Sequence, residues 1–431
     1  MQVLKQQILT REQKESIGLL QIGTFLEYFD LMLYVHMAVL LNELFFPETD
    51  PLTTRLIAAL SFSSVFILRP FGAIIFGYIG DNFGRKLTVI ITTTLMAVSC
   101  IIMYILPTYN DIGITASYIM ILCRAMQGMS SMGEVIGAEI YLTETIKRPI
   151  IFPVVGFITV SLTLGGVAAL AIASLATTEG FNWRYAFLIG TIIAMVGGLA
   201  RTRLRETPDF VNAKKEIQSV FEKTGVDIKL LDKSPIYNEK ANKITAIAYF
   251  LLECSAPTCF FLIYAYSANI LKEVHDYTPG QIIHQNFIVT VIEFFTILLI
   301  TCLSFRIYPL KILKVKLIIF ACFIFILPFI FQYSTSPAGI MLAQLGISCF
   351  GVSVLPAGPI FYSHFPVFKR FTYTGFAYAL SRAIMHLTTS FGFIFLFEYL
   401  GHYGILVIMI PVLIGFAFGL NHFEKLDKQN I

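Results

Sequence analysis

Ionisable side chains lie inside long apolar runs of this sequence, where a charged group is unfavourable unless it is paired or hydrated. In the first half of the chain they are Glu27 and Asp30 in one run, Arg69 in the next and Arg124 in the fourth. Glu27 and Asp30 are three residues apart, so a helix places them on neighbouring positions of one face. Two acids against two arginines is the balance that a buried cluster needs. Such a cluster could bind a proton or a charged solute.

The alternative is that these charges only hold helices together. Arg69 favours this alternative, because it adjoins Pro70 at a predicted helix contact. The other charges have polar neighbours along their stripes: Tyr34 extends the face of the two acids, and Gln127 continues the stripe of Arg124. Tyr34, Arg124 and Gln127 are therefore candidates for substrate binding.

A second candidate stripe lies near the end of the chain, where Tyr378, Arg382 and His386 are spaced by four residues. A helix places all three on one face. An arginine that faces a cavity attracts a carboxylate, and a histidine, with an ordinary pKa of about 6.5, can titrate in the working range. The alternative is that Arg382 pairs with Glu253 or Glu293 as a clamp between helices.

A short charged hairpin separates the second and third apolar runs, in the stretch 69–86, RPFGAIIFGYIGDNFGRK. It turns on three glycines and leaves through Asp81, Arg85 and Lys86. Glycines let two membrane helices approach closely, and basic residues favour the cytoplasmic face. The hairpin therefore suits an inner connection between two membrane helices.

The elements that position these residues follow from the composition of the chain. Of 431 residues, 56% are hydrophobic and 13% are charged, whereas soluble domains carry about a quarter charged residues. The surplus of apolar surface predicts an all-α membrane protein with twelve spans of about 20 residues each. The expected spans are 17–44, 54–79, 87–106, 114–140, 151–176, 183–202, 243–269, 281–304, 312–332, 335–362, 372–397 and 402–421.

One long polar stretch, 203–242, divides these spans into two six-helix bundles, 1–202 and 243–431. Lys and Arg gather in the segments that lie on the side of the N-terminus, while the opposite segments hold only Arg55, Arg184 and Lys272. This bias predicts that both termini are cytoplasmic and that the chain crosses a bacterial inner membrane several times.

Several functions are not expected from this sequence. The net charge of +4 indicates no nucleic-acid partner, and the seven cysteines fall in apolar runs without the spacing of a metal site. No catalytic triad, metal cluster or nucleotide-binding loop is present, so we expect no enzyme, metal or cofactor. The expected partners are a small-molecule substrate, protons and the lipid bilayer, and we expect a monomer.

The N-terminal motifs resemble the metabolite:proton symporters of the major facilitator superfamily, which include proline/betaine, 2-oxoglutarate, citrate and shikimate permeases. The matching stretches cover most of residues 20–210. They are GTFLEYFDLMLYV at 23–35, FFP at 45–47, RPFG at 69–72, GYIGDNFGRK at 77–86, RAMQGMSSMGEVIGAEIYLTE at 124–144, WR at 183–184 and RLRETPDF at 203–210. The second half matches loosely, and there the chain places Arg382 and His386 where the family often has a small polar residue near Ala379.

The resemblance implies proton-coupled uptake by alternating access. An acid of the first helix would take the proton, Asp30 first and then Glu27, and Arg124 would pair with that acid or with a substrate carboxylate. Asp81, Arg85 and Glu144 would form a latch at the inner side. The alternatives are an exporter or antiporter of a small metabolite or drug, and a sensor that does not transport.

Overall fold

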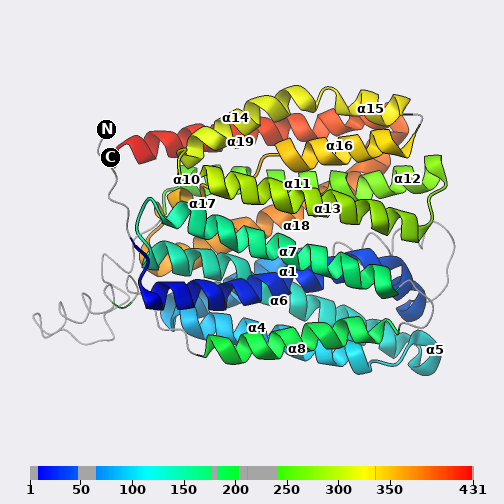
Figure 1. The fold of residues 1–431 in the computed structure, drawn as a ribbon, viewed down its shortest axis with the longest axis horizontal. Helices are drawn as coiled ribbons and strands as arrows, with labels where there is room; N and C mark the ends of the chain where they lie inside the picture. The colour runs from blue at the N-terminus through cyan, green and yellow to red at the C-terminus, as the bar shows by residue number, and fades with distance from the viewer. Residues whose placement is uncertain are drawn as a thin grey trace, which may run out of the picture.

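The computed structural model describes residues 8–46, 65–176, 182–202, 211, 241–334 and 336–429. Within these ranges the regular secondary structure is helical, and no strand is present. The helices run side by side along the long axis of the molecule (Figure 1). The expected linker 203–242 lies almost wholly outside the described ranges, so the boundaries of the two predicted domains stay predictions.

The helices that precede this linker form one bundle, here called the first half, in the lower part of Figure 1. They are α1 (Arg11–Phe45), α3 (Arg69–Asn82), α4 (Arg85–Ile105), the single turn α5 (Tyr109–Ile112), α6 (Ile114–Thr145), α7 (Ile151–Ala176) and α8 (Arg184–Arg201). Within this half α1 packs on α7, and α4 packs on α6 and α8.

The helices that follow the linker form the second half, in the upper part of Figure 1. They are α10 (Lys243–Glu253), α11 (Ser255–Phe260), the π-helical turn η2 (Phe261–Tyr266), α12 (Ser267–His275), α13 (Pro279–Leu303), α14 (Pro309–Phe323), α15 (Leu327–Tyr333), α16 (Pro337–Phe350), α17 (Gly358–Tyr362), the 3-10 turn η3 (Val367–Lys369), α18 (Arg370–Leu400), η4 (Gly401–Tyr403) and α19 (Gly404–Gln429). The two halves meet where α7 packs on α13 and where α3 packs on α18.

Five described helices are long and apolar enough to cross a membrane, and the pair α14 and α15, bent by 41°, makes a sixth. Two shorter apolar helices are α16 and the segment Arg184–Val196 of α8. The other expected spans include α1, α6 and α18, whose hydropathy is lowered by the buried charges described below. The chain is thus a multi-pass membrane protein. The arrangement of the described helices agrees with the twelve expected spans, although six of them meet the length and hydropathy criteria by themselves.

The predicted span 243–269 is a helix that changes type along its length. Pro257 has no backbone N–H, so the carbonyl of Glu253, four residues earlier, loses its helical partner. α10 ends at Glu253, and the next turns are α11 and the π-helical η2. The break leaves a backbone carbonyl free for a side chain of another helix.

Glycines set the closest approaches between helices. A Cβ at Gly165 of α7 would collide with the carbonyl oxygen of Phe25 in α1, and one at Gly128 of α6 would collide with that of Val65. In the predicted hairpin, Gly84 has a φ of 118°, which L residues with side chains rarely adopt. The hairpin between α3 and α4 is therefore as tight as the sequence predicts.

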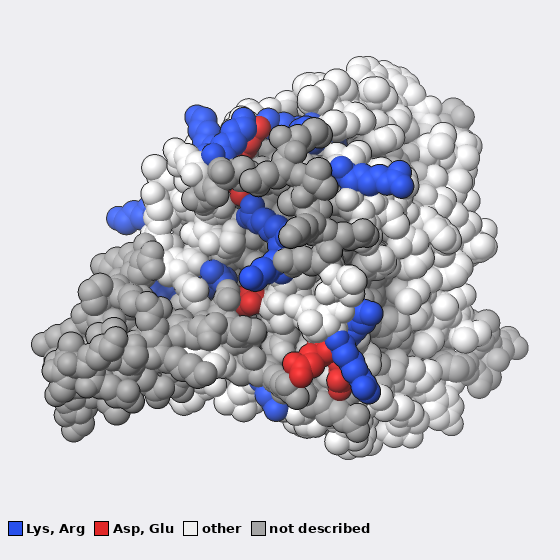
Figure 2. Space-filling model, turned by 60° about the vertical axis from the view of Figure 1, so that its left-hand side comes forward, with Lys and Arg blue, Asp and Glu red and all other residues white. Residues whose placement is uncertain are grey.

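α1 begins and α19 ends at the same end of the molecule, on the left in Figure 1. This end also holds the α3–α4 and α13–α14 loops and the first turn of α18. Figure 2 shows that Lys and Arg dominate the charged surface described there. We call it the basic end, and the opposite end the far end.

Candidate functional site

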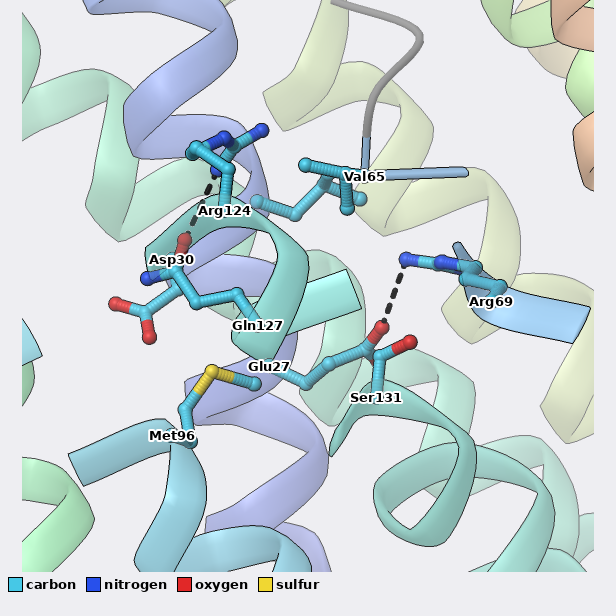
Figure 3. A pocket seen from close by; sticks show the side chains of 9 residues that line it. Glu27, Asp30, Val65, Arg69, Met96, Arg124, Gln127 and Ser131 are labelled. Carbon is cyan, nitrogen blue, oxygen red and sulfur yellow. Dashed lines mark hydrogen bonds and ion pairs between the residues drawn. The ribbon is translucent and has the colours of Figure 1, made fainter. Parts of the chain in front are cut away.

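The first polar cluster lies inside the first half, where a small pocket is lined by side chains of α1, α3, α4 and α6 (Figure 3). Arg69 donates from Nη2 to Oε1 of Glu27 at 3.2 Å, and both residues are at most 3% exposed. Asp30, in the same pocket, accepts a hydrogen bond from the thiol of Cys100 at 3.0 Å. Its other oxygen, Oδ1, has no hydrogen-bond partner among the described residues.

Arg124 enters this pocket from α6. Its Nη1 donates to Oε1 of Gln127 at 3.1 Å, and its guanidinium carbon lies 3.5 Å from the ring centre of Tyr34. Asp30 and Arg124 line the same pocket, yet within the described part of the chain they form no ion pair. The charge of Arg124 is therefore compensated by an aromatic face and an amide rather than by a directly bound carboxylate.

A larger cavity of about 240 Å³ lies between the two halves. Its walls come from α1, α3, α6 and α7 on one side and from α10, α11, η2, α13, α14, α16, α17 and α18 on the other. The charged residues that line it are Glu27, Arg69, Glu139, Glu253, Glu293, Lys316 and Arg382. Glu27 and Arg69 line both cavities, so the small pocket adjoins this central cavity.

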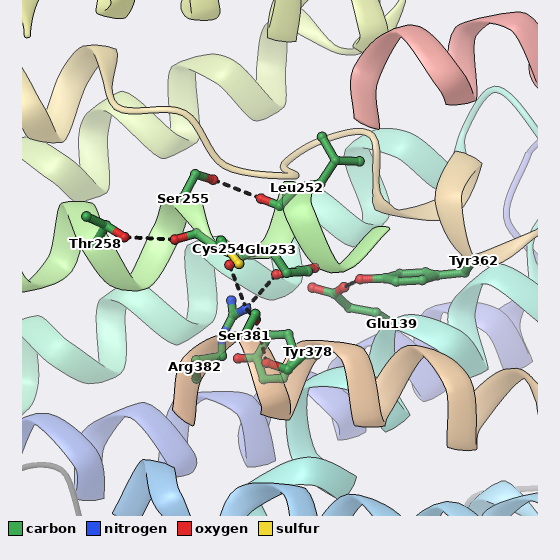
Figure 4. A network of polar contacts seen from close by, with 10 residues as sticks. All are labelled: Glu139, Leu252, Glu253, Cys254, Ser255, Thr258, Tyr362, Tyr378, Ser381 and Arg382. Carbon is green, nitrogen blue, oxygen red and sulfur yellow. Dashed lines mark hydrogen bonds and ion pairs between the residues drawn. The ribbon is translucent and has the colours of Figure 1, made fainter. Parts of the chain in front are cut away.

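Arg382 of α18 is held by Glu253 (Figure 4). Its Nη1 donates to Oε2 of the Glu253 side chain at 2.6 Å and to the backbone carbonyl of the same residue at 3.3 Å. That carbonyl is the one that Pro257 leaves without a helical partner. The guanidinium also covers the ring of Tyr378 at 3.4 Å. Of the two clamps considered from the sequence, the one with Glu253 is present.

His386 lies one turn further along α18 and packs between aromatic rings of both halves. Its ring stacks on Phe66 of the first half with centroids 3.7 Å apart, and it meets Phe260 edge-on at 6.0 Å. His386 and Arg382 both line the central cavity, as their common stripe predicts.

The remaining acids of the cavity have hydroxyl partners. Glu139 of α6 accepts a hydrogen bond from Tyr362 of α17, which joins the two halves. Glu293 of α13 accepts from the hydroxyl of Tyr264 at 2.9 Å, and that hydroxyl also lies 2.7 Å from Oγ1 of Thr290.

The candidate residues thus separate into two places. Tyr378, Arg382 and His386 line the central cavity, whereas Arg124 and Gln127 line only the small pocket. Tyr34 lines neither and lies under Arg124. Arg69, for which the sequence favours a packing role, pairs with Glu27 and lines both cavities.

Two charged cavity residues, Glu139 and Lys316, are absent from the sequence-based candidates. Glu139 lies close to the end of an expected span, and Lys316 appears in the sequence as one of several charges of an inner loop. The signal for Lys316 is its position on the stripe of Ile312 and Phe320, both of which are buried in α14.

At the basic end, Asp81 of the first half caps α18 of the second. Its carboxylate accepts from the backbone N–H groups of Phe371 at 3.2 Å and Thr372 at 2.9 Å, and from the hydroxyl of Thr372 at 2.7 Å. A carboxylate at a helix N-terminus is stabilised by the free N–H groups and the helix dipole. Arg85, the third expected member of the latch, has its side chain outside the described part of the structure.

Two arginines also join the halves at this end. Arg370, the first residue of α18, donates to Glu144 of α6 at 3.0 Å. Arg148, in the loop between α6 and α7, donates to Asp427 of α19 at 2.7 Å, and Tyr308 also donates to Asp427. The basic end is therefore closed by side chains that cross between the halves.

Two helical bundles around a charged central cavity, joined to each other at one end, define the architecture of a membrane carrier. The chain matches the model of the Major Facilitator Superfamily over residues 20–389, and it belongs to that superfamily. The predicted family and its two-bundle α-helical fold are confirmed. Membership in a superfamily of transporters also agrees with the expectation that the chain is no enzyme.

Curated relatives carry the names of transport proteins. A metabolite transport protein of Haemophilus influenzae is 38% identical over 201 residues, covering 44% of this chain and 45% of the relative. The proline/betaine transporter of Salmonella typhimurium is 32% identical over 204 residues, covering 46% and 41%. These matches span less than half of those relatives. The inner membrane metabolite transport protein YhjE of Escherichia coli is 28% identical over 382 residues, covering 83% and 82%.

Solved structures share the fold at low sequence identity. The proton:xylose symporter XylE superposes with a TM-score of 0.77 at 15% identity, covering 96% of this chain and 95% of that one. The human organic anion transporter MFSD10 gives a TM-score of 0.69 at 14% identity, covering 95% and 100%. At this identity the likeness describes the fold alone.

Proposed function

We propose that this chain is a proton-coupled secondary transporter that imports a small zwitterionic or anionic metabolite by alternating access. The central cavity between the two halves supports this proposal, because charged side chains of both halves line it, and hydrogen bonds of Glu144 and Asp81 join the halves at the basic end. The relatives named as proline/betaine and metabolite transporters agree with it.

We further propose that the basic end faces the cytoplasm of a bacterial cell and that the protein lies in the inner membrane. The described Lys and Arg residues outside the spans gather at this end, including those of the α3–α4 and α13–α14 loops. At the far end the described ones are Arg184 and Lys272. Such a bias favours a cytoplasmic location for the basic side and for both termini.

Asp30 is the residue that we propose to carry the coupled proton. Glu27 is already neutralised by Arg69, whereas among the described residues Asp30 is bound by a thiol alone and has one oxygen without a hydrogen-bond partner in a buried pocket. A buried carboxylate without a bound cation gains most from protonation. Arg124, in the same pocket, favours the ionised form, so movement of Arg124 relative to Asp30 would load and release the proton.

Substitution of the proton carrier tests this function in proteoliposomes. With an imposed proton gradient, the wild-type protein should accumulate a labelled zwitterion or organic acid above equilibrium. Asp30→Asn should abolish accumulation while exchange down a solute gradient persists, because the substrate path is intact. Asp111→Asn, at the surface of the far end, is the matched control and should accumulate solute normally.

Three results would contradict different parts of these proposals. Full accumulation by Asp30→Asn would remove Asp30 from the coupling mechanism. Wild-type protein that moves no solute in either direction would contradict transport itself, and accumulation driven only by the opposite gradient would indicate an antiporter.

A further inference from the structure

The two arginines of the central cavity are already bound within the protein. Arg69 pairs with Glu27 at 3.2 Å and Arg382 pairs with Glu253 at 2.6 Å. A solute carboxylate that approached either guanidinium would compete with a buried glutamate, and the displaced glutamate would lose its counter-charge. Neither arginine is thus a ready anchor for a carboxylate.

Lys316 differs from both arginines. It lines the cavity from α14, on the inward stripe of Ile312, Leu313 and Phe320. Among the described residues no carboxylate lies within ion-pair distance of its ammonium group and no hydrogen bond reaches it. Lys314, two residues earlier, shows the contrast, because it is bound to Glu424 at 2.6 Å.

Glu293 offers the opposite charge in the same cavity. It lines the wall formed by α13 and accepts one hydrogen bond, from Tyr264. Its charge interacts with that of Lys316, yet the two groups form no ion pair. The rings of Phe260 and Tyr264, with centroids 5.0 Å apart, line the same cavity. An ammonium group and a carboxylate therefore face one cavity without neutralising each other directly.

We propose that Lys316 and Glu293 form a dipolar site for a small zwitterion, and this proposal rests on the transport function proposed above. The ammonium of Lys316 binds the carboxylate of the solute, a charge-assisted contact. The carboxylate of Glu293 and the aromatic faces beside it stabilise the positively charged nitrogen. A solute with two carboxylates would meet repulsion from Glu293, and an uncharged solute would use neither group.

The size of the cavity agrees with this class of solute. Its volume of about 240 Å³ is below the range of roughly 300–1,000 Å³ that holds drug-sized ligands. A compact metabolite such as an amino acid or a methylated derivative fits a cavity of this volume. Arg382 then serves to hold α18 against α10 and shapes the cavity without binding the solute.

Equilibrium binding to the purified full chain in lipid nanodiscs tests the site. The probes are glycine betaine, L-proline, succinate and D-xylose. We expect the wild-type protein to bind a zwitterion more tightly than succinate and D-xylose. Lys316→Gln should raise the Kd for that zwitterion by about 10- to 100-fold, the range for loss of a hydrogen bond to a charged group.

Three variants separate binding from folding. Lys316→Arg keeps the positive charge and should retain affinity within about threefold. Lys314→Gln removes a lysine of the same helix that faces Glu424, and it should leave the Kd unchanged. Glu293→Gln should weaken zwitterion binding and improve the relative affinity for succinate, because the repulsion is gone.

The site would be overturned by an unchanged Kd in a folded Lys316→Gln variant, or by a wild-type protein that prefers succinate. A large loss of affinity in Arg382→Lys, together with normal binding by Lys316→Gln, would show that Arg382 binds the carboxylate of the solute. In each of these cases the transport function would stand, since the wild-type protein binds a solute. Wild-type protein that binds none of the four probes at millimolar concentration would contradict both proposals.

Discussion

The two loops at the basic end both lie at a carboxylate that binds across the two halves, but this carboxylate comes from a different element in each case. The α3–α4 hairpin carries its own acid, Asp81, which caps the first turn of α18 through backbone N–H groups. The α13–α14 loop carries none, and Asp427 from the last turns of α19 takes that place, where it accepts from Tyr308 and Arg148. Asp81 is thus an acid of the first half that binds the second half, and Asp427 is an acid of the second half that binds the first, although only Asp81 comes from the loop itself.

The two closures, by which we mean the contacts of Asp81 and of Asp427 between the halves, therefore rest on different kinds of interaction. Asp81 binds main-chain groups of a helix that is fixed by its own fold, and it is 3% exposed. Arg148 is a long side chain that is 38% exposed and is held by a single described carboxylate. A helix cap of this kind is stronger than a half-exposed ion pair, whose contribution is reduced by solvent and side-chain entropy.

The strongest way to break this comparison is to remove Asp81. Asp81→Ala deletes the acceptor of three hydrogen bonds at the first turn of α18. We expect the closed basic end to lose about 2–3 kcal/mol, which shifts a two-state population by roughly 30- to 150-fold. Thiol labelling of Thr159→Cys, a cavity-lining residue, from the basic side of a cysteine-free protein should accelerate accordingly. An unchanged labelling rate would show that Asp81 does not hold this end closed.

Removal of Asp427 tests the second closure and should have a smaller effect. Asp427→Asn breaks the pair with the half-exposed Arg148, so we expect a shift of about 1 kcal/mol or less in the same assay. Glu424→Gln is the matched control on α19, because Glu424 binds Lys314 and Lys428 of its own half. An effect as large as that of Asp81→Ala would make the two closures equal and refute the comparison.

The smallest effect is expected from an acid that caps its own turn. Asp111 of α5 accepts from the backbone N–H of Thr108 at 2.9 Å and from its hydroxyl at 2.8 Å, which holds the pKa of Asp111 below its ordinary value. This contribution to stability is present above the unfolded pKa of about 3.9 and is lost as the pH falls through the folded value. The difference in Tm between wild-type protein and Asp111→Asn should therefore be small at pH 7 and vanish in acid. Labelling of the cavity should be the same in both, and altered labelling would show that local caps also control closure.

The sequence predicts the fold and the location of the charged helices well. Hydropathy and the spacing of charges are properties of one helix and do not depend on how that helix is rotated against its neighbours. It places Arg382 and His386 on one stripe, and the structure brings both to the central cavity. It cannot choose between Glu253 and Glu293 as the partner of Arg382, because that choice depends on the break at Pro257, which frees a carbonyl on one particular helix.

The same limit explains the residues that the sequence leaves aside. Lys316 follows three other basic residues near the start of α14, and only the packing of that helix turns it inward. Asp427 lies in a polar tail, far in sequence from the loop that it completes. The spacing of residues along one helix predicts which of them share a face. Which residues of other helices contact that face depends on how the whole bundle packs.

The ion pairs of the central cavity each belong to a single half. Glu27 and Arg69 both come from the first half, and Glu253 and Arg382 both come from the second. When the two halves rock against each other, these two pairs travel as neutral units, and neither pair is pulled apart in the membrane field. Moving one unit charge through that field involves about 2.3 kcal/mol per 100 mV. These two pairs should therefore add nothing to the current that crosses the membrane in each transport cycle.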